Sequence, residues 1–214
     1  MNVALFGGTF DPVHCGHLCA ARAAQQAFAL DRIEFIPVAR PPHKLDRPIT
    51  PFAHRYAMVS LACAGAAEFV PSLLEGPEEG DGKANYSIDT VRKVTAALPP
   101  ADRLYFLIGA DAFLDLPHWR EGTALIESCD FILVSRPGFS IAEIARVVPA
   151  ELRAGAEKAS SVPLRRSTLH LLPTVDSDVS SSGIREAVAA GRSLTGLVPD
   201  AVAEYIQKQG LYRS

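Results

Sequence analysis

The sequence predicts an α/β fold built on a doubly wound parallel sheet, and three observations lead to this prediction. Short apolar runs alternate along the chain with segments of helical composition. Within each run the apolar residues are consecutive, which is typical of strands buried on both faces of a parallel sheet. The chain has 214 residues, of which 48% are hydrophobic and 21% charged, as expected for one globular domain with a substantial core.

The expected elements follow one another in a regular rhythm. Strands are expected at residues 3–6, 34–38, 69–74, 104–108, 131–135 and 169–172, and helices at about 17–29, 51–64, 88–97 and 141–147. The second helix has a clear start signal, with Thr50 as N-cap and Pro51 at the first helical position. Residues 76–83 have the composition of a surface loop, and 149–161 are loosely organised. Because the rhythm resumes after each, residues 1–214 are expected to form a single domain.

Charge and cysteine usage exclude several classes of partner. The net charge is −3, which gives no general attraction to nucleic acid or to an anionic membrane. No apolar run is long enough to span a bilayer, and the first residues lack the basic region of a signal peptide. Cys15, Cys19, Cys63 and Cys129 form no Cys-x-x-Cys pair, so reduced thiols and a cytoplasmic location are expected.

The most informative motif is GGTFDPVHCGH at residues 7–17, between the first expected strand and the first expected helix. Gly7 and Gly8 are expected to let the backbone leave the strand in a conformation that other residues resist. His14 and His17 add donors beside the free N–H groups and positive dipole of a helix start, which together predict a phosphate site. One alternative is that the two histidines bind zinc, although no further ligands stand at compatible spacing. The other is that both are partly buried structural residues with no role in binding.

A second motif, VSSSGIREAV at residues 179–188, opens an amphipathic helix. Three hydroxyls and Arg185 gather in its first turn, and hydroxyls with a bidentate cation suit a polyphosphate. The alternative is that the serines are only N-caps.

Both motifs resemble those of a known superfamily. The first resembles the HxGH signature of the nucleotidyltransferases, and the second resembles their ISSTxIR motif, with Ser182 where Thr is usual. PPHK at 41–44, NYSIDT at 85–90, IGADAF at 108–113, LPHW at 116–119 and SRPG at 135–138 follow in order. Together they resemble the bacterial nicotinate-mononucleotide adenylyltransferases over nearly the whole chain. The resemblance implies a Rossmann-like fold of the nucleotidyltransferase type.

The resemblance also implies roles for individual residues. The implied catalytic residues are His14, His17 and Arg185. The implied ATP-binding residues are these three with Gly7, Gly8, Thr9, Phe10, Gly109, Asp111, Ser181 and Ser182. The implied residues for the second substrate are Lys44 on its phosphate, Trp119 against its pyridine ring, Tyr86, Ser87 and Thr90 around the ring and its carboxylate, and Arg136. Lys44 and Arg136 could instead be solvated charges, Asp111 a helix cap and Trp119 a packing residue. His43, His54, His118 and His170 are left unassigned.

The implied reaction is attack of the nicotinate mononucleotide phosphate on the α-phosphorus of ATP, giving nicotinate adenine dinucleotide and pyrophosphate. Mg²⁺ would arrive with ATP and need no dedicated metal cage. The partners would be ATP and nicotinate mononucleotide, with neither nucleic acid nor membrane, in a monomer or a homo-oligomer. Four alternatives stay open: nicotinamide mononucleotide as acceptor, because Asn85-Tyr86-Ser87 departs from the usual Ser-Tyr-Thr; another phosphate acceptor such as phosphopantetheine; a dinucleotide pyrophosphate hydrolase; and a non-catalytic regulator.

Overall fold

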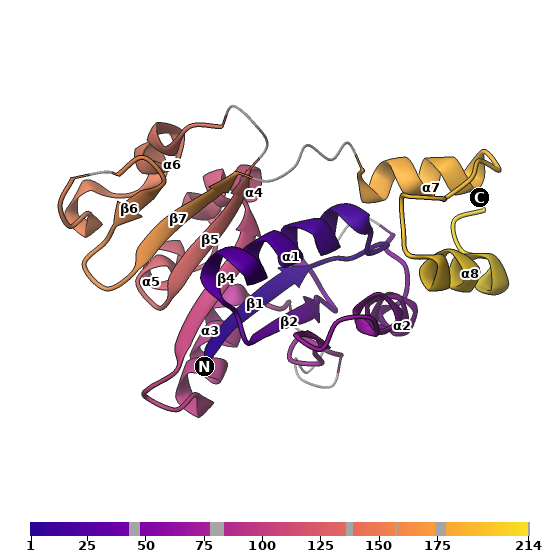
Figure 1. Cartoon of the computed structure of the whole chain (residues 1–214), viewed down its shortest axis with the longest axis horizontal. Helices are drawn as coiled ribbons and strands as arrows, with labels where there is room; N and C mark the ends of the chain where they lie inside the picture. The colour runs from indigo at the N-terminus through magenta and orange to yellow at the C-terminus, as the bar shows by residue number, and fades with distance from the viewer. Residues whose placement is uncertain (43–47, 78–83, 136–138, 157, 174–178, 214) are drawn as a thin grey trace.

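The computed structural model describes residues 1–42, 48–77, 84–135, 139–156, 158–173 and 179–213 (Figure 1). They contain one seven-stranded sheet with the strand order β3-β2-β1-β4-β5-β7-β6. Its strands are β1 (Asn2–Gly8), β2 (Arg32–Pro37), β3 (Phe69–Pro71), β4 (Arg103–Gly109), β5 (Asp130–Ser135), β6 (Ser161–Pro163) and β7 (Thr168–Pro173). All neighbouring pairs are parallel except β6 with β7. The doubly wound α/β prediction is confirmed as a mostly parallel sheet.

Helices cover the sheet as two groups, each packed into its own hydrophobic cluster. One group is α1 (Cys15–Phe28), α2 (Phe52–Cys63), α7 (Ser181–Ala189) and α8 (Asp200–Gln209); the other is α3 (Ser87–Ala97), α4 (Ala110–Leu114), α5 (Gly122–Ile126) and α6 (Ile141–Val147). Two short 3₁₀ helices, η2 (Leu116–His118) and η3 (Ala150–Leu152), complete the described elements. No described helix is both long enough and apolar enough to cross a membrane.

The consecutive apolar residues of the strands are explained by these two clusters. In β1, Val3 and Leu5 point into the cluster of α3–α6, whereas Ala4 and Phe6 point into that of α1, α2, α7 and α8. Successive strand residues face opposite sides of a sheet, so a strand buried on both sides needs apolar residues at every position.

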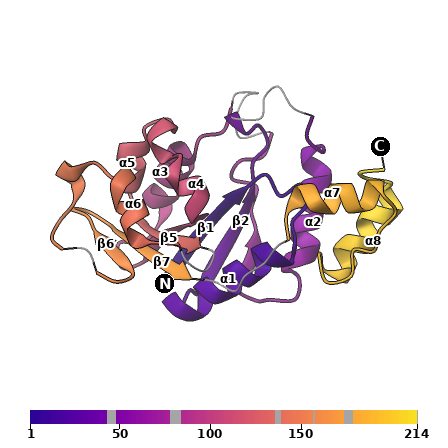
Figure 2. The ribbon, with the colours of Figure 1, turned by 90° about the horizontal axis from the view of Figure 1, so that it is seen from above.

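The C-terminal helices return to the first half of the chain. In Figures 1 and 2, α7 and α8 lie beside α2 at one end of the molecule, where the C-terminus also lies. A hydrogen bond of 2.9 Å joins His54 Nδ1 on α2 to the Tyr205 hydroxyl on α8. The last thirty or so residues are therefore packed against the segment that follows β2.

Several predicted boundaries differ from the structure. β3 ends at Pro71 rather than at residue 74, because the chain turns at once and the Gly76 N–H donates to the Leu73 carbonyl at 2.8 Å. The prediction of Thr50 as the N-cap of the second helix is wrong, because Pro51 occupies that position. β6 begins at the last residue of the segment 149–161, which was expected to be loosely organised. This strand was missed because it has only three residues. Most of the predicted loop at 76–83 lies outside the described residues.

The centre of the sheet supplies a direct test of this packing. The Phe131 side chain is fully buried, and its ring lies 5.4 Å from that of Phe106 and 5.8 Å from that of Phe113. Phe131→Ala should lower the free energy of unfolding by about 3–5 kcal/mol, because it removes buried apolar surface and leaves a cavity. Urea unfolding of the two proteins measures this difference, and a loss below about 1 kcal/mol would contradict the packing described.

Candidate active site

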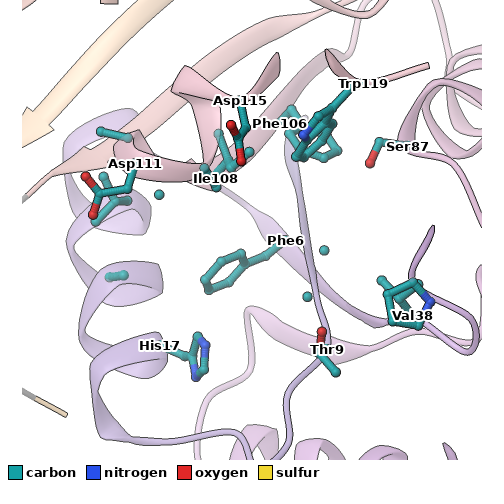
Figure 3. Close-up of a pocket in the computed structure, with 18 of the residues that line it drawn as sticks. Phe6, Thr9, His17, Val38, Ser87, Phe106, Ile108, Asp111, Asp115 and Trp119 are labelled. Carbon is teal, nitrogen blue, oxygen red and sulfur yellow. The ribbon is translucent and has the colours of Figure 1, made fainter. Parts of the chain in front are cut away.

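A cavity of about 870 Å³ opens at the carboxyl ends of the central strands (Figure 3). Its walls come from the ends of β1, β4 and β5, the start of α1, the start of α3, and the segment from α4 to residue 120. The chain runs outward from β1 through β2 and β3, then returns to place β4 on the other side of β1. Such a reversal of strand order leaves a crevice, which is where open α/β sheets bind their ligands.

Gly7 and Gly8 form the end of β1 on the floor of this cavity. The prediction that they take an unusual backbone conformation is wrong, because neither has a positive φ. The residue with a positive φ is Phe10, at 48°. The glycines are needed for space instead: a Cβ on Gly8 would lie 3.1 Å from the Phe10 ring, and a Cβ on Gly7 would project into open space that a ligand could occupy.

His14 and His17 lie at the start of α1 and both line the cavity. Their rings are 3.7 Å apart between centroids and tilted by 30°. The His14 backbone N–H donates to Nδ1 of His17 at 3.2 Å, so the Nε2 of a neutral His17 carries the hydrogen. Nδ1 of His14 is buried and has no hydrogen-bond partner within the described part of the chain. The pair therefore has unused hydrogen-bonding capacity beside the cavity.

Burial keeps both imidazoles neutral near pH 7. It lowers the pKa of His14 from 6.5 to about 4. Burial and then the neighbouring His14 hold the pKa of His17 well below 6.5. Two stacked rings out of water cannot easily both be charged. An anion at the start of α1 would meet neutral N–H donors together with the positive end of the helix dipole.

The second motif meets the first in space. Ser180 is the N-cap of α7, and its Oγ accepts the Gly183 N–H at 3.1 Å. Ser181 Oγ donates to the Pro12 carbonyl at 2.9 Å, and Arg185 Nη1 donates to the Asp11 carbonyl at 2.7 Å. These bonds place the start of α7 against the loop that leads into α1.

The opposite side of the cavity carries the residues predicted for the second substrate. Tyr86 is the N-cap of α3 and Ser87 its first residue, and both line the cavity with Trp119. Figure 3 shows Ser87 and Trp119 together, across the space from His17. The Arg120 guanidinium lies 4.6 Å from the centre of the Tyr86 ring and 3.6 Å from a carboxylate oxygen of Asp89. Gly109 and Asp111, at the end of β4 and in the first turn of α4, line the cavity between the two sides.

Some predicted site residues lie away from the cavity surface. Phe10 is buried against Phe6 and the His17 ring, and Thr90 is buried on α3. Within residues 179–189, Val179 lines the cavity. Ser181, Ser182 and Arg185 follow it in α7 but are not among the lining residues. Lys44 and Arg136 lie outside the described residues.

The cavity also contains polar residues that the sequence did not single out: Glu75, Asp115, His118 and Arg120. Glu75 is 5% exposed, and the Thr90 hydroxyl donates to its Oε1 at 2.6 Å. Burial raises the pKa of this carboxyl. Within the described ranges, no three or more His, Cys, Asp or Glu side chains are grouped so as to hold a metal ion.

Comparison with known proteins shows the family to which the chain belongs. The model of the cytidylyltransferase-like family matches residues 5–187. A probable nicotinate-nucleotide adenylyltransferase of Solibacter usitatus is 44% identical over 212 residues, covering 99% of this chain and 100% of the relative. One from Thermus thermophilus is 41% identical, with full coverage of both chains.

Solved structures show the same fold. The Plasmodium falciparum nicotinic acid mononucleotide adenylyltransferase complexed with APC superimposes with a TM-score of 0.73 at 21% identity, covering 99% of this chain and 96% of that one. The same enzyme complexed with NaAD gives 0.72. The fold and site define a nucleotidyltransferase of the HxGH type. The chain belongs to the cytidylyltransferase-like family and, within it, to the nicotinate-nucleotide adenylyltransferases.

The lowered pKa of His14 predicts how stability depends on pH. As the pH falls below 6.5, the unfolded chain binds a proton at His14 before the folded protein does, so the free energy of unfolding falls until about pH 4. His14 should account for about 2 kcal/mol of the loss between pH 6.5 and 5. Urea unfolding across this range should show a shallower pH dependence in His14→Asn, and identical slopes would contradict a buried neutral His14.

Proposed function

We propose that this cavity joins ATP to nicotinate mononucleotide, releasing pyrophosphate and forming nicotinate adenine dinucleotide. One observation carries the proposal: residues predicted for ATP and residues predicted for the acceptor line the same cavity, from opposite sides. Its volume of about 870 Å³ lies within the range of cavities that enclose small ligands. The naming of full-length relatives as nicotinate-nucleotide adenylyltransferases supports the same reaction.

In this reaction an oxygen of the acceptor phosphate attacks the α-phosphorus of ATP. A bond forms between that oxygen and the α-phosphorus. The bond from the α-phosphorus to the oxygen that bridges to the β-phosphate breaks, and pyrophosphate leaves with the electron pair of that bond. A phosphate is already ionised near pH 7, so no side chain needs to act as nucleophile or base. The protein would accelerate the step by holding the reacting groups in line and by stabilising charge on the transferred phosphate.

The start of α1 is where the ATP phosphates would lie. His17 would donate from Nε2, because its Nδ1 already accepts the His14 N–H. His14 would donate beside it, and Gly7 leaves open space for close approach of the nucleotide. Burial lowers the pKa of both rings, so both are neutral near pH 7. A neutral imidazole keeps one N–H and can donate it to a phosphate oxygen.

The start of α7 would bind the departing pyrophosphate. Ser181 and Ser182 lie in its first turn, and Arg185 one turn further. Arg185 has several N–H donors, of which Nη1 is used by the Asp11 carbonyl. Thr9, with its side chain on the cavity, and Phe10, packed beneath it, would support the nucleotide site. Gly109 and Asp111 would meet the ribose, whose hydroxyls can donate to a carboxylate.

The acceptor would lie across the cavity. Trp119 would stack on the pyridine ring, and the free N–H groups at the start of α3 would bind its carboxylate near Tyr86 and Ser87. Thr90 would support this turn through Glu75. Lys44 and Arg136 are proposed for the acceptor from the family resemblance alone.

Mg²⁺ would enter with ATP and neutralise its phosphates. The donors present fit this role: the carboxylates that line the cavity, Glu75, Asp111 and Asp115, are dispersed along different walls, and Mg²⁺ commonly keeps several waters while bound mainly to phosphate oxygens. We further propose a single catalytic domain over residues 1–214, acting in the cytoplasm as a monomer or homo-oligomer. Its partners would be two small nucleotides rather than nucleic acid or membrane.

Acceptor choice is tested by measuring pyrophosphate release from ATP and Mg²⁺. Nicotinate mononucleotide, nicotinamide mononucleotide and phosphopantetheine are offered separately at equal concentration. The nicotinate compound should give the highest kcat/KM, because the start of α3 favours an anion. Preference for the amide would overturn the assignment of the carboxylate site, and release without any acceptor would indicate a hydrolase.

The phosphate role of His17 is tested by a series of substitutions. His17→Ala should lower kcat by about 10² to 10³ while the protein stays folded, because one donor to the transferred phosphate is lost. His17→Asn keeps an acceptor near the position of Nδ1 and should be equally impaired, whereas His17→Gln can extend an amide toward the position of Nε2 and should recover part of the rate. His170→Ala is the control, since that ring packs on Phe28 at 5.1 Å, away from the cavity. A fully active His17→Ala protein would exclude the assignment.

A further inference from the structure

The loop between β1 and α1 is both buried and strained. Asp11 is 7% exposed and Phe10 is 2% exposed. Phe10 has a φ of 48°, a backbone conformation that is costly for a bulky side chain and persists only where the surroundings hold it. The polar groups of the loop lie away from water and need hydrogen-bond partners. The loop leads directly into His14, so its position determines that of the histidine pair.

Three partners hold the backbone carbonyls of this loop, and each comes from a distant element. Arg55, fully buried on α2, donates from Nη1 to the Thr9 carbonyl at 2.7 Å and from Nε to the Thr50 carbonyl at 2.8 Å. From α7, Arg185 and Ser181 donate to the Asp11 and Pro12 carbonyls, respectively.

The Asp11 side chain is held by two further bonds. The Thr50 N–H donates to Oδ2 at 3.2 Å. The Tyr212 hydroxyl donates to Oδ1 at 2.7 Å, across a sequence separation of 201 residues. Burial raises the pKa of Tyr212, so its phenol remains a donor near pH 7. Tyr212 itself has a φ of 61° and follows Gly210, where α8 ends in a left-handed turn.

We propose that Tyr212 is a positioning residue for adenylyl transfer, fixing the phosphate-binding loop through the Asp11 carboxylate. The C-terminal segment after α8 is thereby part of the catalytic apparatus, although Tyr212 is not among the residues that line the described cavity. This inference rests on the proposed function, since it concerns the transfer step of that reaction.

Loss of the Tyr212 hydroxyl would leave Oδ1 of a buried carboxylate without its donor. An unpaired buried acceptor is unfavourable, and the strained Phe10 conformation would lose part of its support. The loop and the histidine pair would then shift relative to ATP. The acceptor residues belong to α3 and to the segment after η2, so binding of the mononucleotide would be little affected. Errors of about 1 Å in the placement of reacting groups can lower a rate by about 10².

Tyr212→Phe and Tyr205→Phe form a matched pair for the test. Both remove one phenolic hydroxyl from the C-terminal region, but the Tyr205 hydroxyl bonds to His54 on α2 and not to the loop. Tyr212→Phe should lower kcat for pyrophosphate release about tenfold, with KM for nicotinate mononucleotide within twofold of the wild-type value. Tyr205→Phe should keep kcat within twofold. Thermal unfolding of both variants shows whether they lose comparable stability. Equal kcat values in the two variants would overturn the proposal.

A double-mutant cycle identifies the route of the effect. If Tyr212 acts through Asp11, adding Tyr212→Phe to Asp11→Ala should lower kcat by less than twofold further, because Asp11→Ala already removes the oxygen that accepts from the Tyr212 hydroxyl. If the losses of kcat in the two single variants instead multiply in the double variant, the two residues act independently, which would contradict this route.

A readout without turnover separates this inference from the proposed function. In the nucleotide-free protein, Tyr212→Phe should shift the NMR signals of the His14 and His17 rings, whereas Tyr205→Phe should shift those of His54 alone. If the wild-type protein releases no pyrophosphate, the proposed function is refuted. The role of Tyr212 in that reaction is then refuted with it. Unchanged His14 and His17 signals in Tyr212→Phe would refute the positioning itself.

Discussion

The site depends on one interaction: distant segments of the chain donate hydrogen bonds to the buried polar groups of the loop after β1. The Thr9, Asp11 and Pro12 carbonyls accept from side chains on α2 and α7. The Asp11 carboxylate accepts from the Thr50 N–H before α2 and from the Tyr212 hydroxyl near the C-terminus. Because buried polar groups are costly when unpaired, these segments must assemble around the loop for the protein to fold. The same assembly brings the two phosphate motifs together.

The histidine pair shows how the fold tunes chemistry through burial. Stacked rings at the start of α1 stay neutral because burial lowers the pKa of both. Neutral donors suit a reaction whose nucleophile is already ionised, since no proton needs to be removed by the protein. In the proposed reaction, charge would be stabilised by N–H groups, by the helix dipole and by Arg185. Burial also acts on Glu75, where it raises the pKa of the carboxyl, while the Thr90 hydroxyl donates to its Oε1 at 2.6 Å.

The sequence predicted the parts of the molecule that have a local signature. Consecutive apolar residues indicated the doubly buried strands. The spacing of His14 and His17 predicted a phosphate site at a helix start, and the structure shows that both histidines line a cavity there. The backbone conformation predicted for Gly7 and Gly8 was wrong, because the positive φ falls on Phe10, which no propensity rule would select. Arg55, Glu75 and Tyr212 were missed because their partners lie far away in sequence. No pattern around Tyr212 indicates a bond to a residue 201 positions earlier.

The central claim is that this protein accelerates transfer by positioning, without a covalent enzyme intermediate. The stereochemistry at the α-phosphorus tests it most directly. ATP made chiral at that phosphorus with sulfur and oxygen isotopes is converted with nicotinate mononucleotide, and the configuration of the dinucleotide is determined. A single in-line displacement predicts inversion. Retention would require two displacements, and hence a side-chain nucleophile, which would contradict the account of the histidine pair as neutral donors.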